Sequence, residues 1–103
     1  MYVLNIWHTV SDYDEWKKVF DSDPLGREAS GVRRYVLERP VEDENMVIGH
    51  LEFGRLGEAE AFAGRLEETW SGVASEMVSD TGYTITEVRE QREYGGGSAR
   101  RAA

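Results

Sequence analysis

Residues 2–21 read YVLNIWHTVSDYDEWKKVFD, a strand-like stretch followed at once by a helix-like stretch. The β-branched and aromatic residues up to position 10 fit the pleated surface of a strand. Asp12, with Glu15 three residues later, resembles the capping box that begins a helix. Apolar side chains then recur at helical spacing and predict a helix over residues 13–21.

The rest of the chain continues the alternation of strands and helices. Strands are expected over residues 32–39, 46–53 and 83–90, because each is rich in strand-forming residues and bounded by turn signals. An acidic turn between the first two of these predicts a hairpin. A helical pattern runs over residues 59–78, and a turn at residues 80–82 is expected to separate it from the last strand.

The predicted order βαββαβ determines the architecture. With right-handed crossovers it gives a ferredoxin-like α+β fold, with an antiparallel sheet in the order 4-1-3-2 and both helices on one face. Both faces of the first strand are apolar, because Leu4 and Ile6 alternate with Val3 and Trp7. The uncovered face needs a second cover, and two sheets facing each other in a homodimeric barrel would supply it.

Length and composition predict one domain and a tail. The chain has 103 residues, and residues 1–94 are expected to form the domain. Residues 95–103 read GGGSARRAA, a composition that predicts disorder. The start has neither the basic region nor the cleavage site of a secretory signal, so we expect structure from the second residue. No uncharged stretch is long enough to span a bilayer.

The charge balance limits the partners. Acidic residues outnumber basic ones by 20 to 12, which gives a formal net charge of −8. Nucleic acids and anionic membranes both attract positive faces, so we expect neither as a partner. The chain has no cysteine, which excludes disulfides, thiolate nucleophiles and cysteine-ligated metals and suits the reducing cytoplasm.

Several stretches together carry a family resemblance. Residues 8–21 read HTVSDYDEWKKVFD; they are followed by Gly31-Val32, a strand, an acidic turn and the strand that ends at Phe53. The second helix begins with AEAFA at residues 59–63. This arrangement resembles small uncharacterised proteins of the dimeric α+β barrel superfamily, which includes the antibiotic biosynthesis monooxygenases. The resemblance covers nearly all of residues 2–90.

The resemblance implies a fold but several functions. The superfamily also holds isomerases, cyclases, haem-degrading enzymes and regulatory ligand-binding domains, so fold alone does not determine function. In the haem-degrading branch an Asn on the first strand acts with a Trp and a His near the second helix. Asn5 and Trp70 match two of these positions, but the second helix here has no histidine. We therefore expect no cofactor.

Three residues are the candidate catalytic group. His50 and Glu52 would face the barrel interior if the alternate residues of their strand face the helices. If Ile6 lies opposite His50, then His8 is a diagonal neighbour of His50 at about 7 Å. Histidine titrates near neutral pH, and a carboxylate would orient it and raise its pKa. His8 or His50 would then act as a base oriented by Glu52.

Two alternatives remain for the same three residues. Both histidines could be polar residues that line a wet cavity or a dimer seam. Two histidines and a carboxylate also match the ligand set of non-haem iron, although a one-residue slip in register would move one histidine to the opposite face. We expect no metal.

Five further residues are expected to contact a substrate in the barrel interior: Ile6, Ile48, Arg34, Tyr35 and Tyr83. A tyrosine near a pocket can form a hydrogen bond with a phenolic or quinone ligand, and an arginine can hold an anionic oxygen. The other aromatic residues on the two helices, Trp16 and Trp70 among them, are expected in the core.

Two classes of function follow. The first is a cofactor-independent, monooxygenase-like enzyme in which a histidine removes a proton from an apolar or aromatic small molecule. In monooxygenase relatives the resulting carbanion reacts with oxygen, whereas in cyclase or isomerase relatives the proton returns elsewhere. The second is a non-catalytic homodimer that binds a small ligand or a protein partner.

Overall fold

The computed structural model describes residues 1–72 and 75–95. The elements within them are β1 (Tyr2–Val10), α1 (Tyr13–Ser22), β2 (Val32–Glu38), β3 (Met46–Phe53), α2 (Leu56–Ser71) and β4 (Val78–Glu87). The strands form one antiparallel sheet in the order β2-β3-β1-β4, which is the predicted order read from the other edge. The prediction of a ferredoxin-like α+β fold is therefore confirmed.

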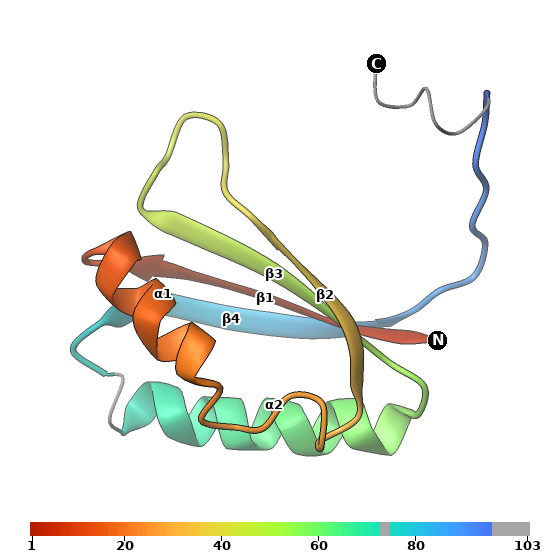
Figure 1. Cartoon of the computed structure of the whole chain (residues 1–103), viewed down its shortest axis with the longest axis horizontal. Helices are drawn as coiled ribbons and strands as arrows, with labels where there is room; N and C mark the ends of the chain where they lie inside the picture. The colour runs from red at the N-terminus through yellow and green to blue at the C-terminus, as the bar shows by residue number, and fades with distance from the viewer. Residues whose placement is uncertain (73–74, 96–103) are drawn as a thin grey trace.

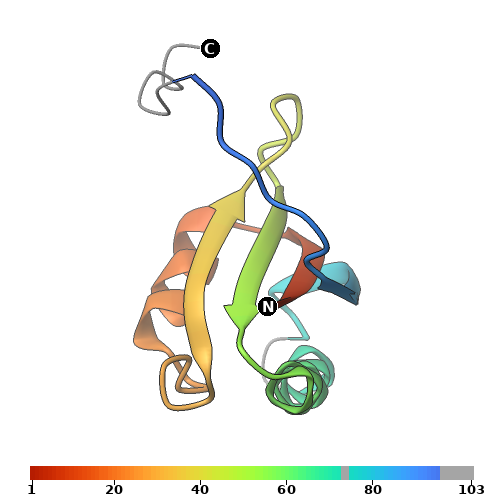
Figure 2. The same cartoon turned by 90° about the vertical axis from the view of Figure 1, so that its right-hand side faces the viewer.

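Both helices pack against the same face of the twisted sheet (Figures 1 and 2). Burial alternates along the central strands because successive side chains point to opposite faces. In β1 the side chains at even positions from Leu4 to Val10 are buried, and in β3 those at odd positions from Val47 to Phe53 are buried. The opposite face of these two strands is only half-buried, and no helix within the described residues covers it.

The core consists of two clusters, one under each helix. The cluster under α2 contains Leu4, Ile6, Leu51, Phe53, Ala59, Phe62 and Ala63. The cluster under α1 contains Val10, Trp16, Val47 and Val78. The gap between the two helices lies above the boundary of these clusters, and it holds the pocket described below.

Capping residues define both ends of helix α1. The Oδ1 atom of Asp12 accepts a hydrogen bond from the backbone N–H of Glu15 at 3.2 Å, as the capping pattern predicts. The helix ends at Ser22, and Asp23 caps it in the left-handed conformation with φ of 56°. Pro24 follows and cannot extend the helix.

The sequence-based boundaries of α2 and β4 were wrong. Helix α2 ends at Ser71, and β4 begins at Val78, whose side chain is buried beside Val10. Residues 80–82 lie within β4 and not in a turn. Trp7 and Thr9 pair with Gly82 and Ser79, so β4 has one extra residue at this point, and Asp80 has a φ of 51°. Turn-forming residues also suit such a β-bulge, which explains the error.

Two sequence-based expectations lie outside the described residues. The helical pattern expected to continue past Gly72 included residues 73–74, and the predicted tail is described only at Gly95. Within the described residues, no helix is both long enough and apolar enough to cross a membrane.

Candidate functional site

The register of β1 and β3 separates the two histidines. Ile6 pairs with Gly49 and His8 pairs with Val47, so His8 lies on the face that the helices cover. His50 pairs with Asn5 on the opposite face. The prediction that His8 and His50 share one pocket with Glu52 was therefore wrong. Paired residues share a face, and a shift of one residue from the expected register reverses the face of every side chain.

His50 forms hydrogen bonds through both ring nitrogens on the open face of the sheet. Its Nδ1 atom lies 2.7 Å from Oδ1 of Asn5, and its Nε2 atom lies 2.9 Å from Oε1 of Glu38. Glu52 accepts a hydrogen bond from Nε of Arg34 at 2.9 Å, and this contact raises the pKa of the Arg34 guanidinium. His50 and Glu52 thus already have partners on this face.

His8 is the polar residue at the centre of the covered face. Its side chain is 1% exposed, and its ring lies between two indoles, with centroid distances of 5.2 Å to Trp16 and 5.9 Å to Trp70. Its Nδ1 atom is buried and has no hydrogen-bond partner in the described part of the chain. Burial lowers the pKa of His8 from 6.5 to about 4, because an apolar site disfavours the charged ring. His8 is therefore neutral at pH 7.

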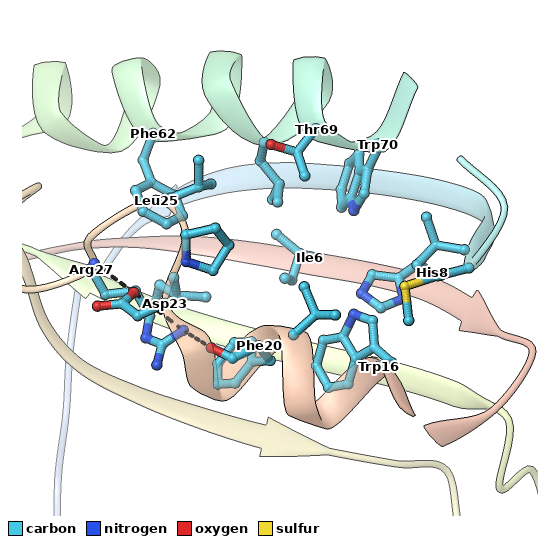
Figure 3. A pocket seen from close by; sticks show the side chains of 16 residues that line it. Ile6, His8, Trp16, Phe20, Asp23, Leu25, Arg27, Phe62, Thr69 and Trp70 are labelled. Carbon is cyan, nitrogen blue, oxygen red and sulfur yellow. Dashed lines mark hydrogen bonds and ion pairs between the residues drawn. The ribbon is translucent and has the colours of Figure 1, made fainter. Parts of the chain in front are cut away.

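A pocket of about 90 Å³ lies between α1, α2 and the sheet, and His8 is at its inner end (Figure 3). Most of its lining is apolar or aromatic. The apolar and aromatic residues that line it are Ile6, Trp16, Val19, Phe20, Leu25, Leu51, Phe62, Leu66, Trp70, Met77 and Val78. A mainly apolar concavity with very few polar groups is typical of a small-molecule site.

The outer end of the pocket is formed by the loop that follows α1. Arg27 there donates a hydrogen bond to the carbonyl of Phe20 at 2.8 Å, lies 3.5 Å from Asp23 and packs over the Phe20 ring at 4.0 Å. Pro24 and Val19 are exposed at this end. The ion pair of Arg27 and Asp23 thus lies at the opposite end of the pocket from His8 (Figure 3).

The structure divides the five predicted substrate contacts between the two faces of the sheet. Ile6 lines the pocket. Tyr83 lies on the same face but lines a separate groove, where its hydroxyl donates to Glu67 at 3.4 Å and the charge of Glu67 raises the pKa of the phenol. The expectation of a single shared interior was therefore wrong.

The remaining three are also outside the His8 pocket. Tyr35 contacts the edge of Phe20, with ring centroids 5.2 Å apart, and its ring faces Arg27. Ile48 and Arg34 lie on the open face with Glu52 and His50. These positions follow from the same parity that separates the two histidines.

Sequence reasoning missed the aromatic residues of the pocket. Trp16 and Trp70 were assigned to the core because each lies on an apolar helix face. The available signal was on β1, where His8 occupies the same parity as Leu4 and Ile6. A histidine on an otherwise apolar strand face indicates a polar group held against the helices.

Within the described residues, no group of three or more His, Asp or Glu side chains is arranged to hold a metal ion. The iron-site alternative for His8, His50 and Glu52 also required them to share a face, which the register contradicts.

Comparison with known proteins gives similarity of structure only. No protein-family model matches the sequence, and no curated protein matches it either. SnoaB from Streptomyces nogalater, a cofactor-independent oxygenase, is 14% identical with a TM-score of 0.65, over 87% of this chain and 94% of SnoaB. A dimeric ferredoxin-like protein from an uncultured marine organism is 12% identical with a TM-score of 0.62, over 90% of this chain and 98% of that protein.

A third similar structure contains a porphyrin. It is a variant of MhuD with two manganese protoporphyrin IX molecules bound per active site, 18% identical with a TM-score of 0.68, over 91% of this chain and 100% of MhuD. The His8 pocket does not fit such a group, since its 90 Å³ is far below the roughly 300–1,000 Å³ of sites for drug-sized ligands.

The resemblance found in the sequence is thus confirmed at the level of the fold, and candidate antibiotic biosynthesis monooxygenases are among the matching structures. The chain therefore has the same ferredoxin-like fold as these solved structures.

Proposed function

We propose that the pocket between α1 and α2 binds a small apolar or aromatic molecule, and that His8 removes a proton from it in a cofactor-independent, monooxygenase-like reaction. One observation carries the proposal. A neutral imidazole with an unpartnered Nδ1 atom is buried at the inner end of an apolar pocket, between the rings of Trp16 and Trp70. A buried polar atom without a partner is rare in native structures, and a ligand is a natural partner for it.

The low pKa of His8 is compatible with the role of a base. Burial keeps the free imidazole unprotonated at neutral pH, so a nitrogen lone pair is available. When a proton passes from the substrate to His8, an anion forms beside the new imidazolium. Opposite charges in contact within an apolar site stabilise each other, which raises the affinity of His8 for the proton at that step.

The reaction needs an acidic C–H bond and molecular oxygen. Proton loss from an activated methylene gives a carbanion, which transfers electrons to O2. The net change converts CH2 into C=O, with the second oxygen atom released as water. O2 is the oxidant, and both hydrogens of the methylene end in water, so no reduced cofactor is required. His50 and Glu52 take no part, since their polar atoms have partners on the other face.

We also propose that two copies pair through the open face of the sheet. Half-buried apolar residues line this face, namely Val3, Trp7, Val36, Met46 and Ile48. The charged groups of this face lie beside partners: Arg34 pairs with Glu52, and His50 pairs with Glu38. Because these groups have partners, the face can be buried against a second copy. The matching marine protein is described as dimeric.

The absence of cysteine supports the cytoplasm as the compartment.

The test uses 3-cyclopentenone, a ketone of six heavy atoms that suits the small volume of the pocket. Its methylene groups lie between a carbon–carbon double bond and a carbonyl. Three measurements are made on the purified protein: binding by NMR, deuterium uptake at the methylene in D2O, and O2 consumption with formation of cyclopent-3-ene-1,2-dione. We expect all three, and we expect His8→Gln to abolish exchange and O2 consumption. His50→Gln is the matched control, because it removes the other histidine of the chain from the opposite face.

The outcomes separate the candidate functions. Binding with exchange but without O2 consumption would replace the oxygenase with an isomerase or cyclase. Binding without either reaction would leave a non-catalytic ligand-binding protein. Activity that is lost in His50→Gln and kept in His8→Gln would contradict the role of His8.

A further inference from the structure

The contact between His50 and Glu38 on the open face requires a proton. Because Asn5 directs its Nδ2 atom to two backbone carbonyls, its Oδ1 atom accepts a hydrogen bond from Nδ1 of His50. In a neutral imidazole only one nitrogen carries a hydrogen, so Nε2 would then present a lone pair. It would face a carboxylate oxygen of Glu38 at 2.9 Å, and two acceptors form no hydrogen bond. The contact is therefore a hydrogen bond only when the pair holds one further proton.

The other charged groups of this face do not replace that proton. Among the paired residues of the four strands, the register places four ionisable side chains on the open face: Arg34 and Glu38 on β2, and His50 and Glu52 on β3. The paired residues of β1 and β4 on this face are uncharged. Arg34 donates to Glu52, so these two charges match each other. With a neutral His50 the four groups leave one carboxylate unmatched, and with an imidazolium they leave none.

A second copy on this face would raise the cost of the unmatched carboxylate. In the single copy the side chain of Glu38 is 53% exposed, so water solvates its charge. Two open faces packed together would remove this water, and burial of a charge without a partner is costly. A protonated His50 supplies the partner, because its Nε2–H then donates a charge-assisted hydrogen bond to Glu38. Two paired copies should therefore hold these protons more tightly than two separate copies.

We propose that the open face is a proton-dependent interface, in which two copies pair while His50 of each is an imidazolium bound to Glu38. The inference rests on the proposed function, because it concerns the same pairing of two copies. A ligand that binds the paired state more tightly promotes pairing, and here the ligand is the proton. The dimer should therefore be tighter at pH 6.5, near which histidine ordinarily titrates, than at pH 8.5. This role of His50 is independent of the pocket that contains His8.

The test measures the dissociation constant of the dimer by sedimentation equilibrium at pH 6.5, 7.5 and 8.5, at fixed ionic strength. We expect an increase of about ten- to a hundredfold from pH 6.5 to 8.5, since each dimer holds two of these charge-assisted hydrogen bonds. His50→Gln should reduce the increase to about threefold or less, because its amide offers an N–H to Glu38 at every pH. An α-amine also titrates in this range, so the informative quantity is the difference between the wild type and His50→Gln.

Two glutamate variants separate the interface from the total charge. Glu38→Gln removes the carboxylate, and its amide can donate to a neutral imidazole, so the dissociation constant should hardly depend on pH. Glu42→Gln is the matched control. It makes the same change of charge at an exposed position in the turn between β2 and β3, and it should keep the wild-type dependence on pH.

Nitrogen NMR of the imidazole rings tests the inference even if the dimer is too tight to dissociate or a variant fails to fold. The chain has two histidines, and His8 is an internal reference for a neutral ring, because burial lowers its pKa to about 4. In the wild-type dimer at pH 7 we expect both ring nitrogens of His50 to carry hydrogen. A neutral His50 in the dimer, with hydrogen on Nδ1 alone, would contradict the inference.

The outcomes distinguish this inference from the proposed pairing. If the dissociation constant does not change with pH, or changes equally in the wild type and His50→Gln, the inference is wrong while the two copies still pair. If the wild type is a monomer at every pH and concentration, the proposed pairing fails together with the inference.

Discussion

The Oδ1 atom of Asn5 lies 2.7 Å from the Nδ1 atom of His50, and this contact connects the two central strands on the open face of the sheet. The orientation of the Asn5 amide follows from its other partners. Its Nδ2 atom is within 3.3 Å of three oxygens: the carbonyls of Val3 and Thr84 and the hydroxyl of Thr86. Because two of these are carbonyls, Nδ2 is the donor, and Oδ1 must accept from the ring. His50 therefore carries a hydrogen on Nδ1.

Replacing Asn5 by Ala should destabilise the protein more than a single surface hydrogen bond would. The change removes the acceptor of His50 and the donor to β4, so the free energy of unfolding should fall by about 1–3 kcal/mol. Urea unfolding measures this, and the nitrogen chemical shift of His50 Nδ1 reports the loss of its hydrogen bond to Asn5. Thr86→Val is the control and should cost less, because it removes only one of these contacts. Equal losses in both variants would show that the Asn5–His50 contact adds nothing.

A charge on the open face should separate the proposed dimer. Ile48→Glu places a carboxylate among the half-buried apolar residues of β3, where a second copy would bury it without a partner. We expect light scattering to give a dimer mass for the wild type and a monomer mass for the variant. Val41→Glu is the control, because Val41 is fully exposed and the dimer should persist. A wild-type monomer would contradict the proposal directly.

Two glycines should respond in opposite directions to replacement by alanine. A Cβ atom on Gly82 would lie within 2.7 Å of three atoms of the Trp7 ring, so Gly82→Ala must displace that ring and destabilise the sheet. A Cβ atom on Gly64, inside α2, would meet nothing within 4 Å. Gly64→Ala should therefore raise the free energy of unfolding by roughly 0.5–1 kcal/mol. Thermal unfolding of both variants measures the two effects, and a stabilising Gly82→Ala would contradict the close packing of Trp7.

Strong local patterns were sufficient to predict most of the fold. The bounds of β1 and β3 were correct because dense β-branched and aromatic residues end at clear turn signals. The start of β4 was not predictable in this way, because residues such as Asp80 and Gly82 are compatible with both a turn and a β-bulge. Local composition does not distinguish these two structures, and the pairing with β1 does.

The candidate site depended on information that local patterns lack. The register of β1 against β3 depends on two strands about 40 residues apart in the sequence. A shift of this register by one residue reverses the face on which His8 lies relative to His50. The roles of Trp16 and Trp70 depended on a gap between two helices, which no periodicity reports. The parity of His8 with Leu4 and Ile6 was nevertheless visible, and it would have placed this histidine beneath the helices.

His8 should make the stability of the protein depend on pH in a defined window. Burial lowers the pKa of His8 from 6.5 to about 4, so between these values the unfolded chain binds a proton that the folded chain does not. The contribution of His8 to the free energy of unfolding is at its maximum above pH 6.5. It falls as the pH decreases toward 4, and it changes no further below that value. The total loss is about 3 kcal/mol, since one pKa unit corresponds to about 1.4 kcal/mol.

Urea unfolding at a series of pH values, at fixed protein concentration, measures the dependence of stability on pH. Carboxylates also titrate in this range, so the informative quantity is the difference between the wild type and His8→Gln, which should lose this component, whereas His50→Gln should keep it. Parallel curves for the wild type and His8→Gln would mean that His8 is not held neutral by burial.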